Sequence, residues 1–197
     1  ENIWLKLHIV CGQKTNVISS AKVTKSDGVG SGDSPQFIPM MQETHDAGFT
    51  IGTAVADKAY LSRANYSLID SFYGETLIPF KANSTGRPQG KSHVWRKAFS
   101  FFQLHQEQFY QRYYVRNNVE TTFHMLKAKL GDNLKSKNFT AQRNELLCKV
   151  IAHNIMVLIA EIYELGIAPQ FAPFDTEKEA IETCTQSNQT APKVLQN

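Results

Sequence analysis

Four polar residues have types and a spacing that could bind a metal ion or a phosphate group. They are Tyr113, Arg116, Glu120 and Lys127. On a helix with Arg116 set at zero, Lys127 lies at about 20°, Glu120 at about 40° and Tyr113 at about 60°. The four side chains therefore share one narrow stripe of a helix predicted over residues 113–130. A carboxylate between two cations on such a stripe is suited to a metal or to an anionic ligand.

The neighbouring stripe of the same predicted helix is apolar and consists of Val119, Phe123, Leu126 and Leu130. This pattern predicts that one edge of the helix packs on a core and that the polar stripe follows the margin of that core. The alternative is an ordinary surface helix, in which Arg116 and Glu120 form a solvated ion pair four residues apart.

The segments before and after this helix predict a mixed α/β fold. Alternating polar and apolar residues, and a short run of small and β-branched residues, indicate strands. Strands are predicted over 4–11, 17–23, 50–56 and 76–80, and helices over 35–48, 62–72, 95–110, 113–130 and 144–165. The first two strands form a hairpin. Asp57 follows the third strand, where it is either a functional acid or a turn former or helix cap.

The bulk composition is that of a globular protein. The chain has 197 residues and a formal net charge of +3, which is too small to indicate a nucleic-acid partner. Three dispersed cysteines give no disulfide framework and suit a reducing compartment. We expect no membrane segment, because His153 and Asn154 interrupt the most apolar stretch. We predict one domain over 1–167 and a loose polar tail over 168–197.

The spacing of Tyr113, Arg116, Glu120 and Lys127 resembles the Y-R-E-K signature of bacterial insertion-sequence DDE transposases. Two other segments resemble the same family in the same order. Residues 56–60 (Ala-Asp-Lys-Ala-Tyr) are similar to the end of the strand that carries its second acid. Residues 32–34 (Gly-Asp-Ser) are similar to a loop after the hairpin that often begins with His. The resemblance runs from about residue 4 to residue 166.

The resemblance implies an α/β, ribonuclease H-like mixed sheet flanked by helices, in which two Asp and one Glu hold two divalent metal ions, Mg²⁺ or Mn²⁺. By the matching positions, Asp57 is the second acid and Glu120 the third. Arg116 and Lys127 would then hold DNA phosphates. Tyr113 would contact the DNA near the cleaved end.

The first acid of the family lies on a first strand, ahead of the hairpin. Nothing at residues 1–3 matches it, and Asp27 and Asp33 come after the hairpin. We therefore expect the first strand to be missing from the front of this chain. We also expect that this chain alone does not catalyse strand transfer.

The implied activity is metal-dependent DNA cleavage at the ends of the element, followed by strand transfer into target DNA. The implied partners are DNA (terminal repeats and target) and a second copy of the chain, as a homodimer on DNA. The implied location is the cytoplasm, at the nucleoid. Two alternatives stay open: an inactive DNA-binding remnant, and a ribonuclease H-like nuclease with another substrate.

A second basic region surrounds two aromatic residues, Trp95 and Phe99. It is either a DNA-facing patch or an ordinary basic surface loop, and its cations are Lys81, Arg87, Lys91, Arg96 and Lys97. Three further cations, which could extend such a patch, are Lys135, Lys137 and Arg143. The aromatic residues between 99 and 110 favour a core over a base-stacking platform.

Overall fold

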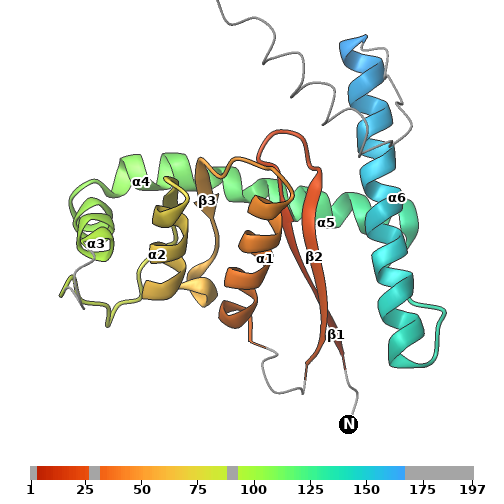
Figure 1. Cartoon of the computed structure of the whole chain (residues 1–197), viewed down its shortest axis with the longest axis horizontal. Coiled ribbons are helices and arrows are strands. Elements are labelled where there is room, and N and C mark those ends of the chain that lie inside the picture. Colours follow the sequence, from red (N-terminus) through yellow and green to blue (C-terminus); the bar gives the residue numbers. More distant parts are fainter. Residues whose placement is uncertain (1–3, 27–31, 88–92, 167–197) are drawn as a thin grey trace, which may run out of the picture. The chain divides into compact units, whose positions relative to one another are not determined.

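The structure, a computed structural model, describes residues 4–26, 32–87 and 93–166. The chain divides into two compact units, Glu1–Glu161 and Ile162–Asn197. The first unit holds every element described below except the last turn of its final helix (Figure 1). The predicted tail over 168–197 lies outside the described residues.

The predicted hairpin is confirmed. Strands β1 (Leu5–Cys11) and β2 (Ile18–Lys25) pair antiparallel, with Leu7 opposite Val23. The turn closes where Gly12 N donates to Val17 O at 2.9 Å. Asn16 takes a positive φ of 56° in this turn, a conformation that Asn tolerates better than most residues.

The other two strands form a separate parallel pair, β3 (Thr53–Val55) with β4 (Glu75–Leu77). The prediction of a mixed α/β chain is therefore confirmed, whereas the prediction of a single mixed sheet is not. The described residues contain two sheets of two strands each. No described strand joins the two sheets.

The helices follow the predicted order, and their bounds differ from the prediction in three places. The α-helices are α1 (Ser34–Asp46), α2 (Arg63–Ser71), α3 (Val94–Leu104), α4 (Gln106–Tyr113), α5 (Asn117–Leu130) and α6 (Phe139–Leu165). Two short 3-10 helices are η1 (Lys58–Tyr60) and η2 (Tyr114–Arg116). The helix predicted over 95–110 is two helices, which separate at His105, whose φ of −130° and ψ of 48° are not helical.

The signature helix begins later than predicted, because η2 precedes α5 and joins it to α4. The three segments follow one another along one line (Figure 1). Helix α6 begins five residues earlier than predicted, where Asn138 Oδ1 accepts a hydrogen bond from Ala141 N at 2.8 Å. Asn is a favourable residue at the start of a helix because its side chain satisfies a free backbone N–H.

The larger core is aromatic and lies among β3, β4 and helices α1 to α4. Phe80, which is 3% exposed, contacts the rings of Tyr66, Trp95, Phe99 and Phe102. The prediction that the aromatic residues of 99–110 form core is thereby confirmed, since Phe102 and Phe109 are buried and their neighbours pack on them. A smaller core joins the hairpin to α5 and α6 and contains Ile18, Leu126 and Val150.

Helix α6 is long and apolar enough to cross a membrane by length and composition, which the sequence analysis did not anticipate. Its polar residues nevertheless bond to the hairpin. Asn154 Oδ1 accepts from Ile18 N, and its Nδ2 donates to Ile18 O, both at 2.8 Å. His153, fully buried, lies 3.0 Å from Asn16 O through Nε2. These bonds account for the two polar residues within the apolar stretch.

Candidate functional site

Asp57 lies just after β3, at the entrance to η1. Its Oδ1 accepts a hydrogen bond from Ala59 N at 2.8 Å, which caps the 3-10 helix. Its other oxygen, Oδ2, lies 3.9 Å from Arg116 Nη2. The residue therefore acts as a cap, as one of the two sequence interpretations had it, and also presents a carboxylate oxygen to α5 and its preceding turn.

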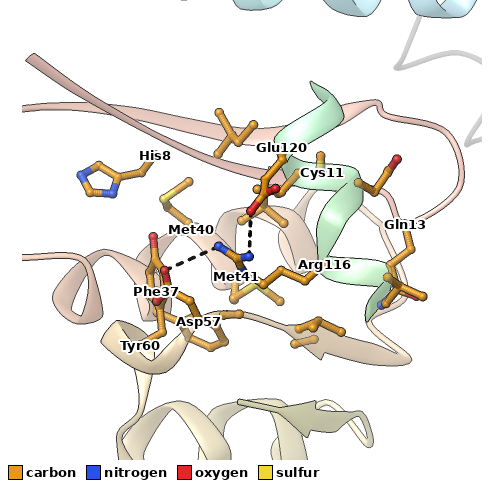
Figure 2. A pocket seen from close by; sticks show the side chains of 18 of the residues that line it. His8, Cys11, Gln13, Phe37, Met40, Met41, Asp57, Tyr60, Arg116 and Glu120 are labelled. Carbon is orange, nitrogen blue, oxygen red and sulfur yellow. Dashed lines mark hydrogen bonds and ion pairs between the residues drawn. The ribbon is translucent and has the colours of Figure 1, made fainter. Parts of the chain in front are cut away.

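Glu120 lies in the first turn of α5. Its Oε1 accepts a hydrogen bond from Arg116 Nη1 at 2.9 Å. Arg116 thus contacts both carboxylates, and Figure 2 shows its guanidinium between Asp57 and Glu120. Two acids that are 63 positions apart in sequence meet around one cation.

Hydrogen bonds to the hairpin turn hold α5 in place. Asn118 Nδ2 donates to Gly12 O at 2.8 Å, and the fully buried Thr122 donates through Oγ1 to Asn16 Oδ1 at 3.1 Å. Sequence analysis did not single out Asn118 and Thr122. The sequence does contain a clue to them. Asn118 and Thr122 are small, polar and four residues apart, so they share a helix face beside the apolar stripe of Val119.

Tyr113 also belongs to this group. It stacks on Phe109 with ring centroids 5.9 Å apart. Burial is the main cause that raises the pKa of its phenol, while Arg116 lowers this pKa and the charges of Asp57 and Glu120 raise it. The phenol therefore keeps its proton at neutral pH and can donate it in a hydrogen bond.

Lys127 lies apart from the other three signature residues. It is exposed and lines a second cavity of about 480 Å³, together with Trp4, Leu126 and Lys149. The polar stripe that sequence analysis predicted is therefore divided: Tyr113, Arg116 and Glu120 lie with Asp57, and Lys127 lies beside another hollow.

Both acids line a cavity of about 330 Å³ (Figure 2). Consecutive residues of two segments line it, namely 7–11 of β1 and 53–57, which are β3 and the two residues after it. Side chains of one strand alternate between its two faces, so a cavity lined by consecutive residues follows the strand edges rather than a sheet face. Tyr60 also lines it, and burial, with the charges of Asp33 and Asp57, raises its pKa to about 12.

The second basic region is arranged differently from a stacking surface. Trp95 is buried, and its Nε1 donates to Thr85 O at 2.8 Å. Arg63 lies over its ring, 4.4 Å from the centroid, and donates to Arg87 O. Both aromatic residues of the region belong to the core, while Lys81, Arg96 and Lys97 are exposed. Lys91 lies outside the described residues.

Comparison with known families decides what kind of domain this is. The family model of the transposase DDE domain matches residues 3–155, which is most of the chain. The chain belongs to the transposase DDE-domain family. Neither the curated proteins nor the solved structures gave a match.

Membership of the DDE-domain family implies a protein that binds DNA, and it agrees with the resemblance that the signature residues carry. DDE transposase domains generally use divalent metal ions. In the described parts of the chain, no group of three or more His, Cys, Asp or Glu residues could hold a metal. Asp57 and Glu120 both lie beside Arg116 in the structure.

Proposed function

We propose that this domain is the metal-dependent catalytic core of an insertion-sequence transposase, which cleaves DNA at the ends of its element and transfers the cut strand to target DNA. One observation carries the proposal: Asp57 and Glu120, the two acids that match the family's motif, meet around Arg116 from separate elements of the fold.

The donor set suits Mg²⁺ or Mn²⁺. Both ions prefer carboxylate oxygens, and Mg²⁺ is commonly bound by one or two carboxylates together with substrate phosphates. Asp57 and Glu120 would be the protein ligands. Bound divalent ions would stabilise the charge that develops on the attacking and leaving oxygens of the phosphodiester.

The remaining signature residues receive binding roles in this proposal. Arg116 offers a planar fork that matches a phosphate, and Lys127 offers a point charge. Tyr113 carries a protonated phenol that can donate to a phosphate oxygen or to a base. The partners are the terminal repeats and the target DNA, with two copies of the chain assembled on DNA in the cytoplasm, at the nucleoid.

The proposal includes a ribonuclease H-like sheet, in which one further strand lies between β1 and β3. Its support comes from the strand edges. The residues that flank β3, Gly52 through its O and Ala56 through its N, bond to β4. The backbone groups of Thr53 and Val55 therefore point away from β4. Thr53 O accepts from the side chain of Gln13.

The same alternation applies to β1. Trp4 O accepts from Ser26 N of the second strand's end, so the backbone groups of Leu7 and Ile9 point away from β2. The edge of β1 that faces away from β2 and the edge of β3 that faces away from β4 both line the cavity that contains the acids. An extended segment in that cavity could bond to both edges and merge the two sheets into one, and an acid on it would lie near Asp57 and Glu120.

A second candidate function is DNA binding without catalysis. The observation that favours it is the ligand count, since the described residues supply two clustered carboxylates and no third His, Cys, Asp or Glu beside them. Arg116 would then serve as a phosphate ligand only.

The two functions are separated by Glu120→Ala in the full-length protein, assayed on a duplex that carries the ends of its own element. We expect this variant to lose Mn²⁺-dependent end cleavage and to keep end binding in a mobility-shift assay. Glu107→Ala, which removes an exposed acid of α4, is the matched control and should cleave normally. Cleavage retained in Glu120→Ala would refute the catalytic role, and binding without cleavage in the unmodified protein would favour the second candidate.

A further inference from the structure

Arg116 contacts the two candidate metal ligands at once, and this contact has a consequence for how the site binds ligands. The guanidinium donates to Glu120 Oε1 at 2.9 Å and lies 3.9 Å from Asp57 Oδ2 (Figure 2). Its side chain is 28% exposed, against 42% for Asp57 and 63% for Glu120. A single positive charge therefore contacts both carboxylates that the proposed function assigns to a divalent cation.

Both ion pairs of Arg116 are of a weak kind. The pair with Glu120 joins residues four apart on the protein surface, and exposed pairs of this kind contribute little to stability. The pair with Asp57 is longer than a hydrogen bond. Apart from the contacts with Arg116 and the bond that Asp57 accepts from Ala59 N, no hydrogen bond of either carboxylate is seen in the described part of the chain.

We propose that Arg116 is a built-in counter-ion of this site, which competes with divalent cations for Asp57 and Glu120 until a DNA phosphate draws it away. This inference rests on the proposed function, in which those two acids bind metal. A phosphate accepts a bidentate pair of hydrogen bonds from a guanidinium, so it can replace both carboxylates as the partner of Arg116. The acids are then free for the metal, and metal and DNA each favour the binding of the other.

The first test measures Mn²⁺ binding without DNA, through the electron paramagnetic resonance signal of free Mn²⁺. Arg116→Ala should bind Mn²⁺ about fivefold more tightly than the unmodified chain, because the competing cation is gone. Arg116→Lys, which keeps the charge and loses the fork, should lie between them. The double variant Asp57→Asn, Glu120→Gln gives the background.

Arg112→Ala is the matched control. Arg112 lies four residues before Arg116, makes a bidentate pair with Glu75, and its loss changes the net charge by the same amount. It should leave the Mn²⁺ affinity unchanged. An equal gain in Arg112→Ala and Arg116→Ala would show a general charge effect and would overturn the proposal.

The second test measures the reciprocal effect on DNA. Duplex affinity, followed by fluorescence anisotropy at constant ionic strength, should rise when Mn²⁺ is added to the unmodified chain. In Arg116→Ala the affinity should be lower, less dependent on salt, and raised less by Mn²⁺ than in the unmodified chain. An unchanged response to Mn²⁺ in Arg116→Ala would overturn the proposal.

The outcomes also separate this inference from the proposed function. Mn²⁺ binding that depends on Asp57 and Glu120 and is equal in the unmodified chain and Arg116→Ala refutes the counter-ion role alone. Binding no better than background in every variant refutes both the counter-ion role and the metal site.

Discussion

The aromatic half of the described structure and its hairpin half are held together by different interactions. The aromatic half consists of β3, β4 and helices α1 to α4, and its core includes a set of contacting rings centred on Phe80. The hairpin half consists of β1, β2, α5 and α6. Its buried apolar core is small, and side-chain bonds from Asn118, Thr122 and Asn154 to the hairpin backbone and turn supplement it.

The candidate site draws one acid from each half. Asp57 follows β3 of the aromatic half, and Glu120 lies on α5 of the hairpin half. Burial of rings is non-directional and tolerates small shifts, whereas hydrogen bonds fix direction and distance. The position of Glu120 thus depends on a small apolar core and a few polar bonds at the hairpin turn, while that of Asp57 depends on a large apolar core.

The largest effect is expected from Phe80→Ala in the aromatic half. Phe80 is 3% exposed and touches four rings, so its truncation leaves a cavity and should lower the free energy of unfolding by about 3–5 kcal/mol. Urea denaturation followed by circular dichroism measures it. Phe49→Ala, at a residue 49% exposed, is the control. Similar losses in both variants would contradict the assignment of the core.

A smaller effect is expected from Asn154→Ala in the hairpin half. The change leaves Ile18 N–H and C=O without their side-chain partner, and unsatisfied buried groups of this kind cost about 1–3 kcal/mol. The same denaturation experiment measures it, with the exposed Asn144→Ala of the same helix as control. If Asn154→Ala were as stable as its control, the hairpin half would not depend on these polar bonds.

The smallest effect is a pH dependence from His8 of β1. Burial lowers its pKa below 6.5, Lys6 and Lys22 lower it further, and Asp33 raises it. Below pH 6.5 the unfolded state therefore binds a proton more readily than the folded state, so stability falls as the pH falls from 6.5 toward the folded pKa. His8→Gln should reduce this slope, and His124→Gln, on an exposed histidine, should not. An unchanged slope in His8→Gln would assign the dependence to another group.

Local patterns in the sequence were sufficient for the hairpin and for most helices. The alternation over 4–11 predicts β1 because a strand with one buried face repeats every two residues. The late start of α5 was not predictable from periodicity. The 3-10 helix η2, which has fewer residues per turn than an α-helix, lies between α4 and α5. The early start of α6 depends on the side chain of Asn138, and also places Phe139 under Lys25 of β2, a contact between distant segments.

The sequence alone determined the family, through the spacing of Tyr113, Arg116, Glu120 and Lys127, because that signature lies within one short segment. It also determined which acids to consider. Only the tertiary structure decided that Asp57 meets Glu120, that Arg116 lies between them, and that Lys127 lies beside a different cavity. The physical reason is that these relations depend on how β3 and α5 are placed by separate cores, and no local periodicity encodes the distance between two side chains on different elements.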